Sequence, residues 1–316
     1  MGKCIAVTGA NGLVGRALCQ RLMSTDAELR ALTRDGQYGL PGERAVGDIG
    51  PDTAWEGVLH GVDGVVHCAA RVHVMDPAAG QDEAAFQRVN AQGTRRLAEA
   101  AARAGVRRLV FLSTIKVNGE SAPPDAPFTA QDSPQPADAY ARSKAAAEAA
   151  LWQVAADTGL EVVVIRPPLV HAPNAGGNLA ALRRLVRLGL PLPLGAAQSP
   201  RAVIGIDNLV DGIVRCLSHT AASGRVWLMR DAEMPTVAEL VGHLARADGR
   251  RPRLIPVPRG WLRSAARVTG QSARVRRLLE PLCMDITDTQ TRLDWQPPRR
   301  LAEGLQRLGE DPPGRP

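Results

Sequence analysis

The stretch 7-VTGANGLVG-15 decides the fold of this chain of 316 residues. Three equally spaced glycines, Gly9, Gly12 and Gly15, separate a short apolar run from residues with helical spacing. Glycine permits a tight turn, lets another backbone approach closely and lets a helix pack directly on its strand. We therefore predict a strand, a glycine loop and a helix in succession.

The same alternation continues through the first half of the chain. Short β-rich runs that are apolar on both faces occur at 3–8, 29–33, 63–69, 107–113 and 161–166. Helical patterns separate them at 13–23, 84–105 and 139–159. Strands buried on both faces and separated by helices indicate a parallel sheet that is covered on both sides. We predict an α/β fold with a Rossmann-type doubly wound parallel sheet.

After about residue 167 the rhythm changes. Loops rich in proline and glycine surround one short helix, residues 203–217 return to a strand and a helix, and 236–248 and 259–279 look helical. We expect a smaller C-terminal substrate lobe over the carboxyl edge of the sheet, where ligands bind in such folds. The expected division assigns 1–166 and about 203–230 to the dinucleotide-binding domain, and 167–202 and about 231–316 to the lobe.

Composition narrows the environments and partners. The five cysteines form no CxxC pair and three lie in apolar runs, which predicts reduced, mostly buried thiols and a cytoplasmic location. The six histidines are scattered, so no metal site is expected. The N-terminal apolar run is too short for a signal peptide, and no run of about 18 apolar residues could form a transmembrane segment.

The formal charge of +7 raises the question of a nucleic-acid partner. Nucleic-acid binding favours clustered basic residues with aromatic side chains that stack on bases. Aromatic residues make up only 3% of this chain, and most arginines are dispersed. We therefore expect no nucleic acid as partner and interpret the charge as a solvated surface with a few anion-binding arginines.

The end of the second predicted strand bears on which dinucleotide the glycine loop would hold. A pyrophosphate fits at the N-terminus of the helix after the glycines. NAD enzymes place a carboxylate at the end of that strand, whereas this chain has Thr33 and Arg34 there. A guanidinium beside a hydroxyl suits a 2′-phosphate, which favours NADP(H), with NAD(H) possible; the alternative is an Arg34 that points into water. Asp48 would meet the adenine, and the HCAA run at 67–70 would line the nicotinamide side.

Tyr140 and Lys144 stand out because the chain holds only two tyrosines and three lysines. They lie four residues apart in a helical pattern and so share one face. A nearby ammonium lowers the pKa of a phenol and prepares it for proton transfer. Thr114, or Ser113 beside it, leaves a strand at the carboxyl edge and could hydrogen-bond the reacting oxygen. These residues predict hydride transfer with Tyr140 as acid or base; the alternative is an interfacial tyrosine, a surface lysine and ordinary turn residues.

Motifs along most of the chain resemble one known family. They are TGANGLVG, GDI, HCAA, VNAQGT, FLSTIKVNG, YARSK, RPPLVHAP, RAVIGIDNLVD and LDW. Together they resemble the extended short-chain dehydrogenase/reductases, and among these the NAD-dependent epimerase/dehydratase family that acts on nucleotide sugars. The resemblance implies that Thr114, Tyr140 and Lys144 are catalytic and that Asn90 has a structural and water-relay role. The residues expected around the cofactor are Gly9, Asn11, Gly12, Leu13, Val14, Gly15, Arg34, Asp48, Ile49, Ala69, Ala70, Arg71, Asn90, Tyr140, Lys144 and Pro167.

Two segments depart from the family's pattern. The usual VYG is Val117-Asn118-Gly119 here, and the usual VYGP is Val170-His171-Ala172-Pro173. Both changes lie near the expected substrate pocket. The IKVNGE variant looks like the branch that includes UDP-N-acetylquinovosamine 4-reductases, which reduce UDP-4-keto-6-deoxy-N-acetylglucosamine in surface-polysaccharide synthesis.

The resemblance also implies residues that bind a UDP-sugar. Beside Thr114, these are Asn178, which opens the helix facing the phosphates, and Arg201, which contacts the pyrophosphate. A second arginine is expected from the C-terminal lobe, with Arg274, Arg276 and Arg277 as candidates. Asp207 and Asn208 are expected to cap the helix that follows them.

Four functions remain open in a stated order. The first is an NADPH-dependent 4-ketoreductase of a UDP-6-deoxy-N-acetylhexosamine, and the second is a UDP-hexose 4-epimerase with tightly bound NAD. A dehydratase is disfavoured because Ile115 and Lys116, rather than an acid–base pair, follow Thr114. The third is a dehydrogenase of a steroid-like or flavonoid-like alcohol. The fourth is an NADP-binding redox sensor, a class that tends to lose the Tyr–Lys pair.

Two surfaces suggest partners. The resemblance implies a homodimer through the helix that carries Tyr140, and residues 145–156 are small and apolar enough for close helix packing. The segment 259–279 is basic and amphipathic. Such a helix can lie on a membrane surface, although a lobe that covers the nucleotide is the preferred interpretation.

Overall fold

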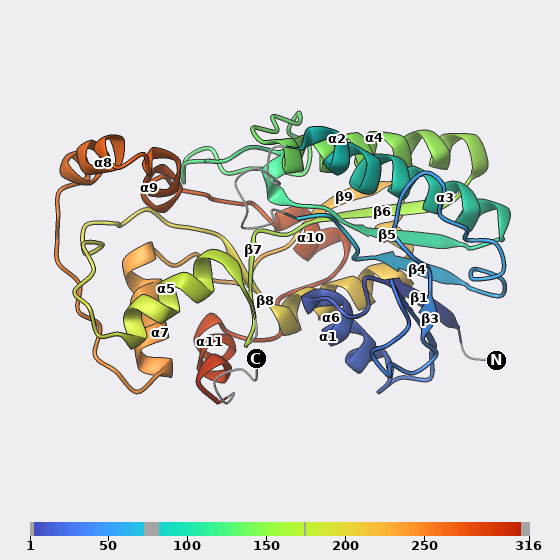
Figure 1. The fold of residues 1–316 in the computed structure, drawn as a ribbon, viewed down its shortest axis with the longest axis horizontal. Coiled ribbons are helices and arrows are strands. Elements are labelled where there is room, and N and C mark those ends of the chain that lie inside the picture. Colours follow the sequence, from blue (N-terminus) through green and yellow to red (C-terminus); the bar gives the residue numbers. More distant parts are fainter. Residues whose placement is uncertain (1–2, 73–81, 174, 311–316) are drawn as a thin grey trace.

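A seven-stranded parallel sheet forms the centre of the computed structural model, which describes residues 3–72, 82–173 and 175–310. Its strand order is β3-β2-β1-β4-β5-β6-β9 (Figure 1). The strands are β1 (Cys4–Thr8), β2 (Glu28–Thr33), β3 (Arg44–Ala45), β4 (Gly64–His67), β5 (Arg108–Leu112), β6 (Glu161–Arg166) and β9 (Arg225–Leu228). The predicted doubly wound fold is confirmed. The strand order reverses between β1 and β4, and this reversal opens a ligand crevice at their carboxyl ends.

Helices cover both faces of the sheet (Figure 1). On one face α1 (Leu13–Leu22) and α6 (Ile206–Ser218) share a hydrophobic cluster with the sheet, and Leu18 and Ile213 are fully buried in it. On the other face α3 (Gly93–Arg103) and α4 (Ala139–Thr158) pack with the sheet around Leu97 and Leu151. Burial on both faces explains the continuous apolar runs of the strands.

The helix predicted at 84–105 contains a widened turn. It consists of α2 (Glu83–Phe86), a π-helix η2 (Gln87–Gln92) and α3. Asn90 lies within this π-helix and is buried. Because π turns add a residue to the helical repeat and occur mostly at functional sites, the segment draws attention to Asn90.

The second half of the chain returns to the sheet only in part. β7 (Leu169–His171) pairs with β8 (Val203–Gly205) in a separate two-stranded parallel sheet, and β9 supplies the seventh strand of the main sheet. The predicted strand and helix at 203–217 are therefore present as β8 and α6. The assignment of whole segments to two domains stays a prediction.

The remaining helices lie at the carboxyl end of the sheet (Figure 1). α5 (Gly177–Arg187), α7 (Val237–Ala247) and α11 (Leu301–Glu310) bury one leucine-rich cluster that includes Leu179, Leu244 and Leu305. The segment predicted as one helix at 259–279 is two helices, because Gly270 adopts a positive φ of 67° after the first. The other elements are α8 (Arg259–Val268), α9 (Ser272–Leu279), α10 (Thr287–Arg292) and the 3₁₀ turns η3 (Ile115–Val117) and η4 (Thr220–Ala222).

The prediction that Asp207 and Asn208 cap α6 is wrong. The helix begins one residue earlier than that prediction requires, and its N-cap Gly205 has no side chain to donate or accept. Asp207 pairs with Arg299 at 3.0 Å and also with Arg307. Asn208 donates to Asp231 at 2.7 Å. Both side chains therefore bind segments far along the chain, and a local pattern cannot show such partners.

Across the described ranges, none of the helices has both the length and the apolar character needed to cross a bilayer.

Candidate functional site

The glycine loop leaves no room for side chains between β1, β4 and α1. A Cβ on Gly9 would lie 2.8 Å from Cα of Ala69, and one on Gly15 would lie 2.1 Å from the carbonyl oxygen of Gly9. Gly9 also has a φ of +64°, which disfavours other residues. No side chain caps α1, whose N-cap is Gly12. Its first-turn N–H groups, which include those of Leu13 and Val14, are therefore available to an anion, and the cradle fits a dinucleotide pyrophosphate.

The predicted adenosine end brings Arg34 and Asp48 together. Arg34 Nε lies 2.8 Å from Oδ1 of Asp48, and both side chains are exposed. Thr33 is buried and donates its hydroxyl to Glu43 at 2.7 Å. Glu43 also accepts from backbone N–H groups of the loop that follows β2, and these hydrogen bonds lower its pKa. Ile49 follows Asp48 and packs against the helical layer at Gly93.

Asn90 fixes the segment after β4, where Ala69, Ala70 and Arg71 lie half-buried. Its Oδ1 accepts from the N–H of Arg71 at 2.8 Å, and its Nδ2 donates to the carbonyl of Arg71 at 3.0 Å. The same Nδ2 lies 2.9 Å from Oγ of Ser143 in α4. Asn90 thus joins the π-helix, the segment after β4 and the helix that carries Tyr140. This geometry is that of a positioning residue.

An ion pair joins the segments that carry the three predicted catalytic residues. Thr114 follows β5 and caps η3, with Oγ1 accepting from the N–H of Lys116 at 3.3 Å. Lys116 Nζ lies 2.6 Å from Oδ2 of Asp138. Asp138 caps α4 by accepting from Ala141 N–H at 2.8 Å, two residues before Tyr140. The turn at Thr114 is also tied to Pro167, whose carbonyl accepts from the N–H at position 115 at 2.9 Å.

Tyr140 and Lys144 lie one turn apart on α4 in a largely buried environment. The ring of Tyr140 meets Phe86 edge to face at 6.2 Å between centroids. Lys144 is buried, and its Nζ lies 4.0 Å from the centre of the Phe111 ring. A cation over a ring face is stabilised by the ring's quadrupole. The two side chains therefore lie on the same helix, but neither is a surface residue.

The pKa of Tyr140 moves in the direction opposite to the prediction. Burial, and secondarily the carboxylate of Asp138, raises the pKa of Tyr140 to about 12. Burial lowers the pKa of Lys144 to about 7, against the opposing effect of Glu148. Desolvation disfavours the charged form of each group, and it outweighs the attraction expected between ammonium and phenolate. Tyr140 is accordingly a protonated phenol at neutral pH.

A buried ion pair removes Ser113 from the candidates for the reacting oxygen. Ser113 donates its hydroxyl to Oε1 of Glu148 at 2.5 Å. Glu148 accepts two hydrogen bonds from Arg166, at 3.0 and 2.5 Å, and Arg166 donates to Asn118 at 2.9 Å. Thr114 has no such commitment. Sequence reasoning missed Glu148, although its position four residues after Lys144 placed it on the Tyr–Lys face.

A second buried chain of hydrogen bonds passes through His67, which sequence reasoning treated only as part of the nicotinamide side. Thr94 donates its hydroxyl to the carbonyl of Asn90 at 2.5 Å, so Nε2 of His67, 3.0 Å away, must donate to Thr94. Nδ1 of His67 then accepts from Thr8 at 2.6 Å. Burial lowers the pKa of His67 to about 3, with help from Lys144. The neutral ring stacks on Phe111 at 5.7 Å and supports the ring beneath the Lys144 ammonium.

The expected substrate arginines gather near Glu120. Arg201 donates through Nη1 to the carbonyl of Glu280 at 2.7 Å and to the carbonyl of Arg277. Arg277 and Arg276 each donate to Glu120 at 3.1 Å. Burial, followed by the charge of Arg277, lowers the pKa of Arg201. Two guanidiniums this close favour an anion between them.

Two further predicted residues cannot be placed beyond their backbone. Asn178 is the second residue of α5, and Arg274 lies in α9. Their side chains fall outside the part of the chain that the structure describes.

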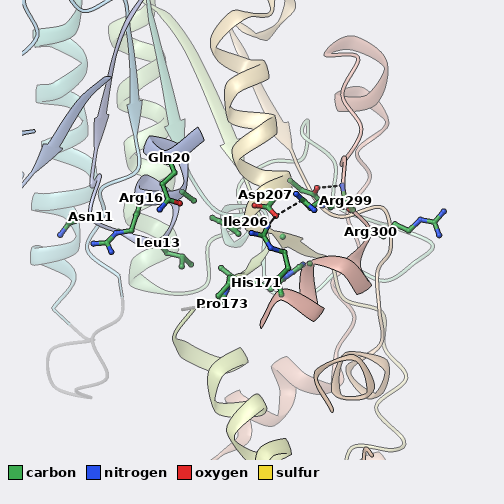
Figure 2. Close-up of a pocket in the computed structure, with 17 residues that line it drawn as sticks. Asn11, Leu13, Arg16, Gln20, His171, Pro173, Ile206, Asp207, Arg299 and Arg300 are labelled. Carbon is green, nitrogen blue, oxygen red and sulfur yellow. Dashed lines mark hydrogen bonds and ion pairs between the residues drawn. The ribbon is translucent and has the colours of Figure 1, made fainter. Parts of the chain in front are cut away.

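A cavity of about 590 Å³ lies in front of α1, between α6 and α11 (Figure 2). It begins at Asn11 and Gly12 of the glycine loop, and four arginines contribute to its lining. These are Arg16, Arg299, Arg300 and Arg307. Sequence reasoning missed it, because its walls come from segments about 290 residues apart and the local motifs give no signal for their meeting.

His171, from the departed VYGP segment, closes one wall of this cavity (Figure 2). Its Nε2 lies 2.7 Å from Asp231 Oδ2, and Asp231 also accepts from the N–H of Gly205 at 2.9 Å. A Cβ on Gly304 would lie 2.7 Å from the imidazole, so α11 packs directly on the ring. The histidine therefore joins β7, the start of α6 and α11.

Comparisons with known proteins agree with this geometry. Residues 5–229 match the model of the NAD dependent epimerase/dehydratase family. The chain is 39% identical over 315 residues to a UDP-glucose 4-epimerase of Vibrio cholerae, with 98% of this chain and 95% of that protein covered. It is 27% identical over 285 residues to a GDP-6-deoxy-D-mannose reductase of Pseudomonas aeruginosa, with 87% and 90% covered. The solved UDP-N-acetylglucosamine 4-epimerase of Bacillus cereus has the same fold, with a TM-score of 0.80, 20% identity and 98% and 99% covered.

Proposed function

Because the chain belongs to the NAD dependent epimerase/dehydratase family, we propose that it reduces a 4-keto nucleotide sugar with NADPH. The observation that carries this choice is Arg34, which follows β2 with an exposed guanidinium paired only to the exposed carboxylate of Asp48. A 2′-phosphate is a stronger bidentate partner for that guanidinium than a single exposed carboxylate. The proposed substrate is a UDP-4-keto-6-deoxy-N-acetylhexosamine used in surface-polysaccharide synthesis.

The proton side of the reaction is assigned to Tyr140 and Thr114. NADPH supplies a hydride to C4 when it is bound at the glycine loop. Thr114 would hold the C4 oxygen by a hydrogen bond, and Tyr140 would donate its proton to that oxygen. The raised pKa of Tyr140 supports this direction, because the phenol keeps its proton at neutral pH until charge develops on the substrate oxygen. Lys144, one turn away, would bind the cofactor's ribose, as the family resemblance implies.

The diphosphate of the substrate is assigned to the arginines beside Glu120. Arg201 is held by two backbone carbonyls, so its remaining N–H groups are oriented without loss of side-chain entropy. Arg277 lies beside it and has Glu120 as an exchangeable partner. The start of α5, where Asn178 lies, would supply helix N–H groups to the same anion.

A second candidate is a UDP-hexose 4-epimerase with tightly bound NAD. The relative from Vibrio cholerae, 39% identical over nearly the whole chain, carries that name and favours it. The same residues would then remove a proton and later return it. The raised pKa of Tyr140 does not favour the first of these steps, because a phenol that holds its proton is a poor base.

One assay separates the two candidates. Purified protein is given UDP-4-keto-6-deoxy-N-acetylglucosamine with NADPH or NADH, and in parallel UDP-glucose without added cofactor. Stoichiometric NADPH oxidation to a 4-hydroxy sugar supports the reductase. UDP-galactose formation with NAD released on denaturation supports the epimerase and overturns the proposal. Tyr140→Phe should lower either rate by about 10²–10⁴, whereas Tyr38→Phe, at an exposed loop position, should not.

We also propose a cytoplasmic homodimer. All five cysteines are free thiols, which suits a reducing compartment. Ala149 and Gln153 lie on an exposed strip of α4, within the segment 145–156 expected at the dimer interface. Light scattering at micromolar concentration tests the assembly, and a monodisperse monomer would contradict it.

A further inference from the structure

The segment between Asp248 and Glu280 carries nine arginines and no acidic residue. Two of the nine, Arg276 and Arg277, pair with Glu120, and the side chain of Arg274 is outside the described part. The other six are all exposed, and no ion pair joins them to a described carboxylate. They are Arg250, Arg251, Arg253, Arg259, Arg263 and Arg267. This concentration contrasts with the dispersed arginines of the rest of the chain.

α8 presents apolar side chains outward between these arginines. Trp261 is 75% exposed and Val268 is 89% exposed. With Ala265 they follow the i, i+4, i+7 spacing of a single helical face. The opposite face packs on the protein through Leu262 and Ala266. The helix is therefore held by its inner face and leaves a tryptophan and a valine to the surroundings.

The exposed apolar surface continues onto the neighbouring loops. Leu188 is 61% exposed and Leu190 is 50% exposed. Arg253 donates to the carbonyl between them, at Gly189, at 3.3 Å, and the N–H of Ile255 donates to Leu192 at 2.8 Å. Arg259 at the start of α8 is joined to the same loop through the carbonyl of Ala196 at 3.4 Å. We call α8 with segments 188–190 and 250–255 the end face; α8 lies at the opposite end of the molecule from the N-terminus (Figure 1).

We propose that the end face docks on an anionic phospholipid bilayer. Arginine side chains attract anionic headgroups, and tryptophan prefers the boundary between headgroups and acyl chains. A basic amphipathic helix with exposed Trp and Val lies in that boundary with its apolar side down. Both features occur on the end face in the arrangement that this mode requires, and they go beyond the proposed reaction.

Two other occupants fit the end face less well. A second copy would bring the same six arginines into contact with these six, and like charges oppose such a symmetric interface. A nucleic acid would use several aromatic platforms for stacking, whereas Trp261 is the single aromatic residue in the segments that form the end face. Anionic lipid satisfies both the arginines and the apolar side chains.

The test uses the full-length protein and sedimentation with two kinds of vesicle, one of phosphatidylcholine alone and one of phosphatidylcholine and phosphatidylglycerol in equal amounts. We expect binding to the anionic vesicles, weak binding to the neutral ones, and loss of binding at high salt. Arg263→Glu with Arg267→Glu should weaken partitioning by at least about fivefold per residue. Trp261→Ser with Val268→Ser should also weaken it, at unchanged charge.

A matched control carries the same charge change elsewhere. Arg21→Glu with Arg103→Glu alters exposed arginines in the last turns of α1 and α3, and its vesicle binding should fall far less than that of the end-face pair. Circular dichroism confirms that each variant is folded. The proposal is overturned if the wild type ignores anionic vesicles, if the two arginine pairs weaken binding equally, or if an oligonucleotide or self-association, rather than lipid, responds to the end-face variants.

Discussion

The ammonium of Lys116 lies 2.6 Å from a carboxylate oxygen of Asp138, and this pair joins the turn of Thr114 to the helix of Tyr140. Asp138 serves two further purposes at once. It caps α4, and its charge contributes to the raised pKa of Tyr140. A single carboxylate thus links the geometry of the candidate site to the protonation of its tyrosine.

Asp138→Asn should lower the pKa of Tyr140 without unfolding α4. Asparagine caps helices about as well as aspartate, so stability should change by less than about 1 kcal/mol. Removing the negative charge removes one cause of the raised phenol pKa. If the protonated phenol is the acid, activity disappears above its pKa, so the basic limb of the kcat/KM profile should move to lower pH. Asp157→Asn, on an exposed carboxylate at the end of α4, is the control and should leave that limb in place.

Lys144→Met should stabilise the protein most near neutral pH. Burial lowers the pKa of Lys144 from 10.5 to about 7. Between these values the unfolded chain binds a proton that the folded chain lacks, so wild-type stability rises with pH there by up to about 1.4 kcal/mol per unit. The advantage of the variant should therefore shrink from pH 7 to pH 9 in urea unfolding. Lys3→Met, at an exposed position, should show no such trend; a constant advantage of Lys144→Met would contradict the burial argument.

Glu148→Gln should destabilise the fold strongly. Glu148 and Arg166 are both buried and share two hydrogen bonds. Removing one charge leaves the other unpaired away from water, at a cost of about 3–5 kcal/mol. The urea midpoint measures this loss. Glu99→Gln breaks the more exposed pair with Arg95 and should cost no more than about 1 kcal/mol, so equal losses for the two variants would be a failure of the prediction.

Arg34→Gln should shift the cofactor preference. A charge-assisted contact to a 2′-phosphate is worth about 1.5–3 kcal/mol, so the KM for NADPH should rise about 10- to 100-fold while that for NADH changes little. Arg44→Gln, on the neighbouring strand β3, is the matched control because its guanidinium bonds only the adjacent backbone at Glu43. If the two variants respond alike, or if NADH suffers as much as NADPH, Arg34 does not bind a 2′-phosphate.

Several features of the site follow from local sequence alone. The apolar runs, the spacing of Gly9, Gly12 and Gly15, and the four-residue step from Tyr140 to Lys144 determine the sheet, the cradle and the shared helix face, because periodicity and turn geometry depend on neighbouring residues. The predicted strands and helices accordingly reappear within a few residues of their expected bounds, apart from the π turn around Asn90 and the break at Gly270.

Tertiary structure decided what depends on distant partners and on burial. It assigned Ser113 to Glu148, turned Asp207 and Asn208 from expected caps into partners of distant segments, and brought Arg16 and Arg307 to one cavity. It also reversed the expected pKa shift of Tyr140. The sequence shows that an ammonium lies one turn away, but the exclusion of water, which penalises charge on both groups, arises only when the chain closes around them.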